Sequence, residues 1–178
     1  MQLSRRALIG AVLAGMAATR ARPSSAALAE SGPRRLAFYN LHTGERLTAT
    51  YWAEGRYIAG ELQGIDRVLR DFRTGDVAPI DRNLLDLLHV LRRKMDTREP
   101  FHVISGYRSP RTNDMLRHES GGVAANSLHM AGKAIDIRIP GRRLIDLRDA
   151  GLALQSGGVG YYPKDGFIHV DTGRVRTW

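Results

Sequence analysis

Three side chains in the C-terminal half of the chain have the types expected of a metal site: His129, Asp136 and His169, here called the metal triad. Two imidazoles and one carboxylate match the ligand preferences of zinc and leave a fourth position free, as in catalytic zinc sites. The chain has no cysteine, so thiolate ligands and disulfides are excluded. A histidine and a nearby aspartate are also common as a surface pair, so spacing alone leaves both interpretations open.

Two apolar runs near these residues predict strands that direct the polar side chains to one side. Isoleucines alternate with Asp136 along 133–139, and apolar residues alternate with His169 and Asp171 along 167–171. Because successive side chains of a strand point to opposite faces, all three polar residues are expected opposite the core. Two strands can then aim ligands at one point.

The rest of the sequence predicts a scaffold around this site. Gly132, between two triad residues, permits a sharp approach from loop to strand. The expected fold class is α+β, a small antiparallel sheet flanked by helices, in one domain spanning 30–178. Periodicity predicts strands at 36–42, 47–52, 101–105 and 157–162, helices at 61–72, 81–95 and 142–154, and a short helix starting at Pro110.

Length and composition fit one globular domain. Of 178 residues, 43% are hydrophobic and 25% are charged, so disorder and a multi-span membrane fold are poor interpretations. The formal charge of +9 falls to +5 without the four arginines of the N-terminal leader. No dense basic run with interleaved aromatic residues is present in the sequence, so nucleic acid is not an expected partner, whereas this charge suits an anionic cell-wall polymer.

Residues 1–29 have the layout of a signal peptide. Arg5 and Arg6 precede an apolar run of about 12 residues, and small residues follow through Ala29. The run is shorter than the roughly 20 residues that span a bilayer, so we expect cleavage and no stable membrane insertion afterwards. The arginine pair indicates export by the twin-arginine route, with an ordinary secretory leader as the alternative. Either route predicts the periplasm or the cell surface.

Several separated motifs resemble those of known zinc peptidases. The segment 127–136 fills every fixed position of the SxHxxGxAxD signature shared by D-Ala-D-Ala carboxypeptidases, lysostaphin-type enzymes and the hedgehog fold. The segment 105–109 reads SGYRS, as in the D-Ala-D-Ala peptidase branch. The segments 36–45 and 157–173 are similar to the murein endopeptidase K family. The resemblance covers essentially the whole mature domain and implies a hedgehog/D-Ala-D-Ala-peptidase-like fold.

This resemblance implies that the metal triad binds Zn2+, with manganese or iron as alternatives for a similar ligand set. It also implies that Arg108 stabilises the oxyanion of the tetrahedral intermediate or holds a substrate carboxylate. Ser127 is expected to contact the substrate or to position the ligand loop. Tyr107 and His118 are further candidate substrate contacts. For Arg108 and His118, a surface role is the alternative.

The general base is the open part of the pattern. Many members of the group place a Glu three residues, or a His two residues, before the last ligand, but this chain has Gly166 and Phe167 there. Asp171 is expected either to accept a proton from the attacking water or to orient His169 through a hydrogen bond. Asp165 is a weaker candidate on a loop.

The resemblance therefore implies a zinc-dependent peptidoglycan endopeptidase. Its substrates would be peptide cross-links between two diaminopimelate residues, or between D-Ala and diaminopimelate. Two alternatives stand beside this hypothesis. One is a non-catalytic peptidoglycan-binding zinc protein, motivated by the missing base, and the other is a D,D- or L,D-carboxypeptidase that trims uncross-linked stems.

Overall fold

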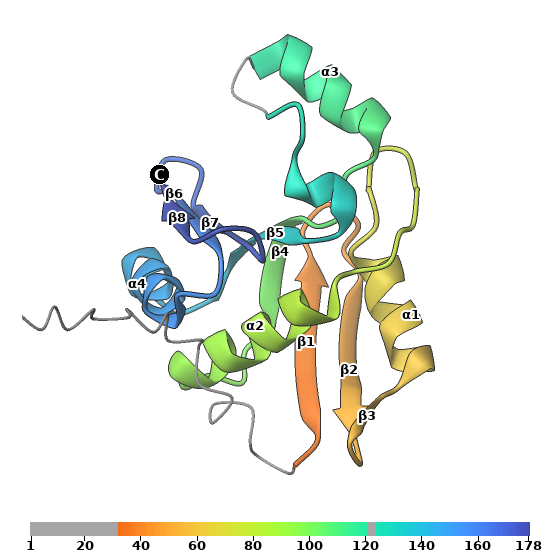
Figure 1. The fold of residues 1–178 in the computed structure, drawn as a ribbon, viewed down its shortest axis with the longest axis vertical. Helices are drawn as coiled ribbons and strands as arrows, with labels where there is room; N and C mark the ends of the chain where they lie inside the picture. Colours follow the sequence, from red (N-terminus) through yellow and green to blue (C-terminus); the bar gives the residue numbers. More distant parts are fainter. Residues whose placement is uncertain (1–31, 121–123) are drawn as a thin grey trace, which may run out of the picture.

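The computed structural model describes residues 32–120 and 124–178, which form one mixed sheet with helices packed against it (Figure 1). The sheet has eight strands in the order β3-β2-β1-β4-β5-β7-β6-β8. The predicted leader lies outside the described residues. In chain order the elements are β1 (Arg34–Asn40), β2 (Arg46–Ala53), β3 (Arg56–Tyr57), α1 (Ala59–Val68), α2 (Arg82–Lys94), β4 (Phe101–Ser105), α3 (Pro110–Ser120), η2 (Leu128–Ala131), β5 (Ala134–Arg138), α4 (Leu144–Leu154), β6 (Gly158–Tyr162), β7 (Phe167–Asp171) and β8 (Arg176–Thr177).

The α+β class predicted from the sequence is confirmed, but the sheet is larger than expected and mixed rather than antiparallel. β1 pairs parallel with β4, and β6 pairs parallel with β8. The first pair is parallel because the chain between its strands makes β2, β3, α1 and α2 before it returns to the starting end of β1. β8 has two residues, too few for alternation to reveal a strand in the sequence.

Helices α1, α2 and α4 bury one face of the sheet. α1 contacts β2, α2 contacts β1 and α4, and α4 contacts β6 and β7. α2 begins at the predicted N-cap Asp81, whose carboxylate accepts a hydrogen bond from Asn83 N at 3.0 Å. The buried core between sheet and helices includes Leu36, Phe38, Ala49, Tyr51, Leu84, Leu88, Phe101, Val103, Ile135, Ile137, Ile168 and Val170.

The polar side chains predicted to bind a metal lie on the face of the sheet that is opposite the helices. Because Ile135, Ile137 and Ile168 lie in the core, alternation places Asp136 and His169 on the face away from the helices. α3 extends beyond η2 at one end of the molecule, apart from the helices of the core (Figure 1). Within 32–120 and 124–178, no helix combines the length and the apolar character needed to cross a bilayer.

The first helix is shorter than predicted. α1 ends at Val68, before the expected end at Phe72. The carboxylate of Asp71 accepts hydrogen bonds from Arg73 N at 2.9 Å and from Ser109 N at 2.8 Å. Asp71 therefore lies beyond the end of α1, where its carboxylate holds Ser109 in the segment that follows β4.

Candidate metal centre

The metal triad is assembled from η2 and from two paired strands. Asp136 of β5 lies opposite His169 of β7 in the antiparallel register, so both side chains stand on the same face. His129 lies in η2, whose N-cap Ser127 accepts a hydrogen bond from His129 N at 3.4 Å. The strand alternation expected from the sequence is therefore present, and a capped helical turn supplies the third side chain.

Gly132 makes the connection from η2 to β5 possible. Its φ of 65° lies in the left-handed region, which side chains other than glycine rarely adopt. A Cβ at this position would also collide with the carbonyl oxygen of Pro79. The carbonyl of Gly132 accepts a hydrogen bond from Asp81 N at 2.9 Å, which ties this turn to the start of α2. The glycine thus fixes how His129 approaches the strand that bears Asp136.

The three side chains of the triad point their ligand atoms at one another. One such atom from each residue lies within 4.8 Å of the others. Asp136 Oδ1 is 2.9 Å from His169 Nδ1 and 3.3 Å from His129 Nε2, and these two nitrogens are 3.2 Å apart. Their exposed fractions are 3% for His129, 7% for Asp136 and 9% for His169. Ligand atoms that are buried together lose their hydrogen bonds to water, and a cation bound between them compensates for that loss.

The far nitrogens of the two imidazoles have partners of their own. His129 Nδ1 lies 2.7 Å from the carbonyl oxygen of Gly106, and His169 Nε2 lies 3.0 Å from Asp171 Oδ2. Both partners accept hydrogen bonds, so each far nitrogen can carry the proton of a neutral ring, which frees the near nitrogen to bind a metal ion. Metal-binding histidines almost always have this outer hydrogen bond. The triad therefore fits a divalent cation such as zinc.

Electrostatics keep the carboxylate of the triad ionised. Burial raises the pKa of Asp136, but the charges and hydrogen bonds of His129 and His169 outweigh burial and hold this pKa well below its usual range. Burial lowers the pKa of His169, and its hydrogen bonds with Asp136 and Asp171 more than reverse that shift. Asp136 is thus a carboxylate at neutral pH, the form that binds a metal ion.

Asp171 is a buried carboxylate saturated with donors. Its Oδ2 atom lies 3.0 Å from His169 Nε2 and accepts a hydrogen bond from Arg176 Nη2 at 2.7 Å. Its Oδ1 atom accepts from the backbone N–H groups of Gly158 at 3.1 Å and Gly173 at 2.8 Å. Burial raises the pKa of Asp171, but the hydrogen bonds from His169 and its other donors lower it well below the usual range. The ionised carboxylate fixes the ring of His169.

Arg108 lies against the metal triad. Its Nη2 atom is 3.9 Å from Asp136 Oδ2, and its side chain is 12% exposed. Its buried Nε atom has no hydrogen-bond partner among the described residues. Burial lowers the pKa of Arg108 while the charge of Asp136 opposes that shift, and a guanidinium stays charged at any physiological pH. The N–H of Arg108 donates to the carbonyl oxygen of His129 at 3.2 Å, which joins this segment to η2.

Asp71 is a residue of this region that motif and alternation arguments do not identify. Its Oδ2 atom accepts hydrogen bonds from Ser109 N at 2.8 Å and from Ser109 Oγ at 2.7 Å. Ser109 directly follows Arg108 in the chain. Burial raises the pKa of Asp71, but hydrogen bonds from Thr112, Ser109 and Arg73 bring it down to about 2. The available signal was its position where the helical periodicity stops; its partner is 38 residues away.

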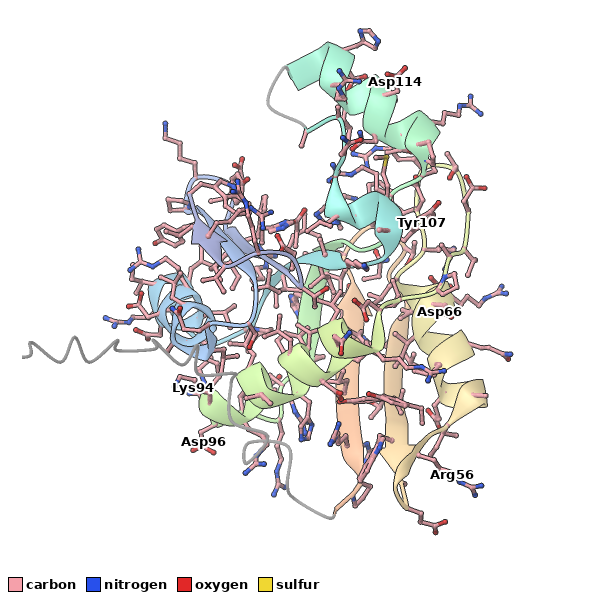
Figure 2. The ribbon with its side chains drawn as sticks, viewed as in Figure 1. Arg56, Asp66, Lys94, Asp96, Tyr107 and Asp114 are labelled. Atoms are coloured by element: carbon pink, nitrogen blue, oxygen red, sulfur yellow. The ribbon has the colours of Figure 1, made fainter. Side chains whose placement is uncertain are left out.

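The structure separates the three predicted substrate contacts. Ser127 adjoins the metal triad through His129, and Tyr107 packs partly buried against the hydrophobic core. The side chain of His118 is 80% exposed on α3, with its Nε2 atom 3.7 Å from Asp114 Oδ2. Figure 2 shows Asp114 on α3 and Tyr107 closer to the body of the molecule. Substrate contact by these three residues stays a prediction.

The sequence is similar to one family of proteins along nearly its whole length. The family profile described as peptidoglycan L,D-endopeptidase MepK matches residues 28–178. The peptidoglycan L,D-endopeptidase MepK of Escherichia coli (strain K12) is 43% identical over 177 residues, which cover 98% of this chain and 97% of the relative. The probable peptidoglycan L,D-endopeptidase MepK of Haemophilus influenzae is 46% identical over 147 residues, 82% of this chain and 79% of the relative. The matched range, residues 28–178, contains the positions of the metal triad, Arg108 and Asp171.

Proposed function

The chain belongs to the peptidoglycan L,D-endopeptidase MepK family, and we propose that it is a zinc-dependent hydrolase that cuts peptide cross-links of the bacterial cell wall. The observation that carries this proposal is the convergence of one carboxylate oxygen and two imidazole nitrogens at a buried point, within 4.8 Å of one another. The far nitrogens of both imidazoles are already hydrogen-bonded, so the ligand atoms are held ready for a metal ion.

The proposed bond joins two diaminopimelate residues. Such a bond links an L centre of one residue to a D centre of the other, whereas a bond from D-Ala to diaminopimelate links two D centres. The names of the relatives specify an L,D-endopeptidase, which favours the first of these two substrates for this chain. The D-Ala cross-link is the comparison substrate in the test below.

We assign the metal site to His129 Nε2, Asp136 Oδ1 and His169 Nδ1, the atoms that face one another. A zinc ion bound there supplies Lewis acidity, which activates a water molecule and polarises the scissile carbonyl group. The chain's own part is to hold these atoms in place and to keep both imidazoles in the required tautomer. Gly106 and Asp171 perform the second task through their hydrogen bonds with the far nitrogens.

We assign to Arg108 the task of stabilising the negative charge that develops on the scissile carbonyl oxygen. Its guanidinium lies beside Asp136 and is mostly buried, so its charge acts through a medium of low polarity. Its buried Nε–H group has no partner among the described residues, so part of the donor capacity of the guanidinium is not used within that part of the protein. The carboxylate of a substrate peptide is the alternative acceptor, because a guanidinium pairs with both groups.

Asp171 is assigned to orienting His169 rather than to accepting a proton. The carboxylate is fully buried, and both of its oxygen atoms already have donors, so no lone pair is directed at a reacting water. The low pKa of Asp171 makes it a weak proton acceptor. The positions that carry a base in many related zinc peptidases are occupied by Gly166 and Phe167, neither of which can accept a proton.

A cell-wall substrate places the enzyme outside the cytoplasm, and we propose the twin-arginine route for its export. The proposal rests on Arg5 and Arg6 before the apolar run of the leader. Replacing both arginines with lysine keeps the positive charge and removes the paired arginines. The uncleaved precursor should then accumulate in the cytoplasm, as followed by fractionation; unchanged export of the mature protein would rule out this route.

The test of the proposed activity is a digest of purified dimers by the mature, zinc-loaded protein. One dimer carries a diaminopimelate–diaminopimelate cross-link and the other a D-Ala–diaminopimelate cross-link, and products are identified by mass spectrometry. We expect monomers from the first dimer and far slower cleavage of the second. His169→Ala should abolish the reaction, whereas His102→Ala, a histidine on β4 outside the triad, should retain it.

Three results of this digest would contradict the proposal, each in its own way. Loss of a terminal residue from uncross-linked stems without a fall in cross-linking would make the protein a carboxypeptidase. Binding of peptidoglycan without any zinc-dependent product would make it a binding protein. Preferential cleavage of the D-Ala cross-link would reverse the assigned bond.

A further inference from the structure

Trp178 lies beside the metal triad although no motif includes it. The residue follows β8, and its backbone extends the edge of the sheet: Tyr161 N donates to Trp178 O at 3.0 Å. The centroid of its ring is 5.2 Å from that of His169, with the two rings inclined at 51°. An aromatic ring is therefore in contact with one of the proposed metal ligands.

Gly160 leaves the space that the indole occupies. In the register of β6 and β7, Gly160 lies directly opposite His169, so both positions belong to the sheet face that carries the triad. A Cβ at Gly160 would lie 2.7 Å from the ring of Trp178. The indole thus occupies the space over a strand position without a side chain, on the same face as the metal ligands.

Two further contacts fix the orientation of the ring. Trp178 Nε1 donates a hydrogen bond to Tyr162 Oη at 2.7 Å, and the ring of Tyr162 stacks on Phe167 with centroids 4.7 Å apart. The guanidinium carbon of Arg176 lies 4.7 Å from the centroid of Trp178. Arg176 also donates to Asp171, so the indole and the carboxylate that orients His169 are held by the same side chain.

Despite these contacts, 49% of Trp178 is exposed, and it is the one aromatic residue among the exposed large hydrophobic side chains of the described part of the chain. An aromatic ring that is held in place and still open to water offers a large apolar area against which a ligand can pack. Its position beside His169 brings this ring close to any substrate that binds at the triad.

We propose that Trp178 is the apolar wall of the substrate site and packs against the aliphatic chain of the diaminopimelate residue at the scissile bond. This inference rests on the proposed function and names the part of the substrate that the ring recognises. The chain of methylene groups between the two centres of diaminopimelate is the most apolar part of such a cross-link. An indole face suits it, while the charged groups of the same residue require partners such as Arg108.

The first experiment uses Trp178 as its own reporter. The sequence has two tryptophans, and Trp52 lies on β2 with Arg34 stacked on its ring, outside the proposed site. Trp52→Phe leaves Trp178 as the only indole and should keep wild-type turnover. Rapid mixing of this zinc-loaded variant with the diaminopimelate-linked dimer should give a saturable change in tryptophan emission before product forms.

The second experiment separates recognition from packing. Trp178→Ala should raise the KM for the dimer about tenfold or more, with kcat changed less than about threefold, because the ring contacts the substrate in both ground state and transition state. Trp178→Phe should recover much of the loss, since it restores an aromatic face. Zinc content should stay at the wild-type level in both variants, which shows that His169 is undisturbed.

The outcomes distinguish this inference from the proposed function. If the wild type cuts the dimer but Trp178 emission does not respond at saturating dimer, the inference is wrong and the cleavage stands. It is also wrong if Trp178→Ala lowers kcat and zinc content together with an unchanged KM, since the ring then only packs against His169. If the wild type does not cut the dimer but the emission still responds, the cleavage is wrong and the binding surface stands.

Discussion

Two of the largely buried polar clusters of the protein satisfy their atoms in different ways. Beside β1, β2 and α2, Asp86 accepts hydrogen bonds from Arg34 Nη1 at 2.7 Å, Tyr51 Oη at 2.9 Å and Tyr57 Oη at 2.8 Å. Each of these partners donates to the carboxylate, so the hydrogen-bond acceptors of Asp86 are satisfied within the protein. In the metal triad, the atoms that face one another are a carboxylate oxygen and two imidazole nitrogens, and the far nitrogen of each ring has an acceptor of its own. That arrangement is one that a bound cation would complete.

The pKa values express the same difference. Burial, and then the hydrogen bond and charge of Asp86, raise the pKa of Tyr57 to about 12, so its hydroxyl remains a donor at any physiological pH. The pKa of Asp136, by contrast, is raised by burial but held low by the positive charge and hydrogen bonds of the neighbouring imidazoles, a charge that a bound cation would replace. A buried group of paired donors and acceptors therefore indicates architecture, whereas buried acceptors that face one another indicate a ligand.

The strongest way to break this comparison is to remove the carboxylate of the metal triad. Asp136→Asn keeps the shape of the side chain but removes the charge that binds the cation. We expect the variant to lose its zinc and its hydrolysis of the diaminopimelate-linked dimer to fall by about 10³-fold or more. Metal analysis and initial rates measure both effects.

A thermal unfolding experiment supplies the control for Asp136→Asn. Added zinc should raise the unfolding temperature of the wild type, because it binds the folded state, and should leave that of the variant unchanged. A variant that still binds one zinc ion per molecule and turns over normally would show that the carboxylate is not a ligand.

The matched change in the other cluster should have the opposite pattern. Asp86→Asn removes the charge that Arg34 and the two tyrosines share, so the free energy of unfolding should fall by about 2–4 kcal/mol. Zinc content per folded molecule and kcat should stay at wild-type values. Chemical denaturation measures the first quantity and metal analysis the second; loss of zinc in this variant would undo the distinction between the clusters.

The triad was open to prediction from the sequence because its geometry is local. Strand alternation has a period of two residues, so the isoleucines around Asp136 and the apolar neighbours of His169 were enough to assign each side chain to a face. The N-cap at Asp81 and the turn at Gly132 depend on equally short patterns. Motif resemblance then added His129, which no periodicity singles out.

The missed residues depend on contacts between distant parts of the chain. Asp71 reaches Ser109 across 38 positions, and nothing near Asp71 in the sequence indicates that partner. Trp178 approaches His169 because β8 pairs in parallel with β6, through a strand of two residues. The parallel pairs of the sheet were missed for the same reason, since strand order is set by packing of the whole domain.

Asp171 sharpens the comparison because it has features of both clusters: it is saturated with donors, yet one of those donors is a proposed metal ligand. Asp171→Asn removes the charge that fixes the tautomer of His169, so zinc affinity should fall about 10- to 100-fold. Titration against a competing chelator measures this change. A variant that binds zinc as tightly as the wild type but has lost turnover would instead make Asp171 the proton acceptor.

Asp71 lies next to the site but is satisfied by donors, so it should behave as Asp86 does and not as Asp136 does. Its folded pKa of about 2 is below the ordinary value of about 3.9, so its contribution to stability is present above pH 4 and is lost as the pH falls towards 2. Wild type and Asp71→Asn should therefore differ by about 2 kcal/mol in the free energy of unfolding at pH 6. The difference should shrink towards zero near pH 2, as measured by denaturation across that range, while zinc content at pH 7 stays equal. A difference that does not change with pH would mean that the charge of Asp71 has no part in holding Ser109, and that only its shape matters there.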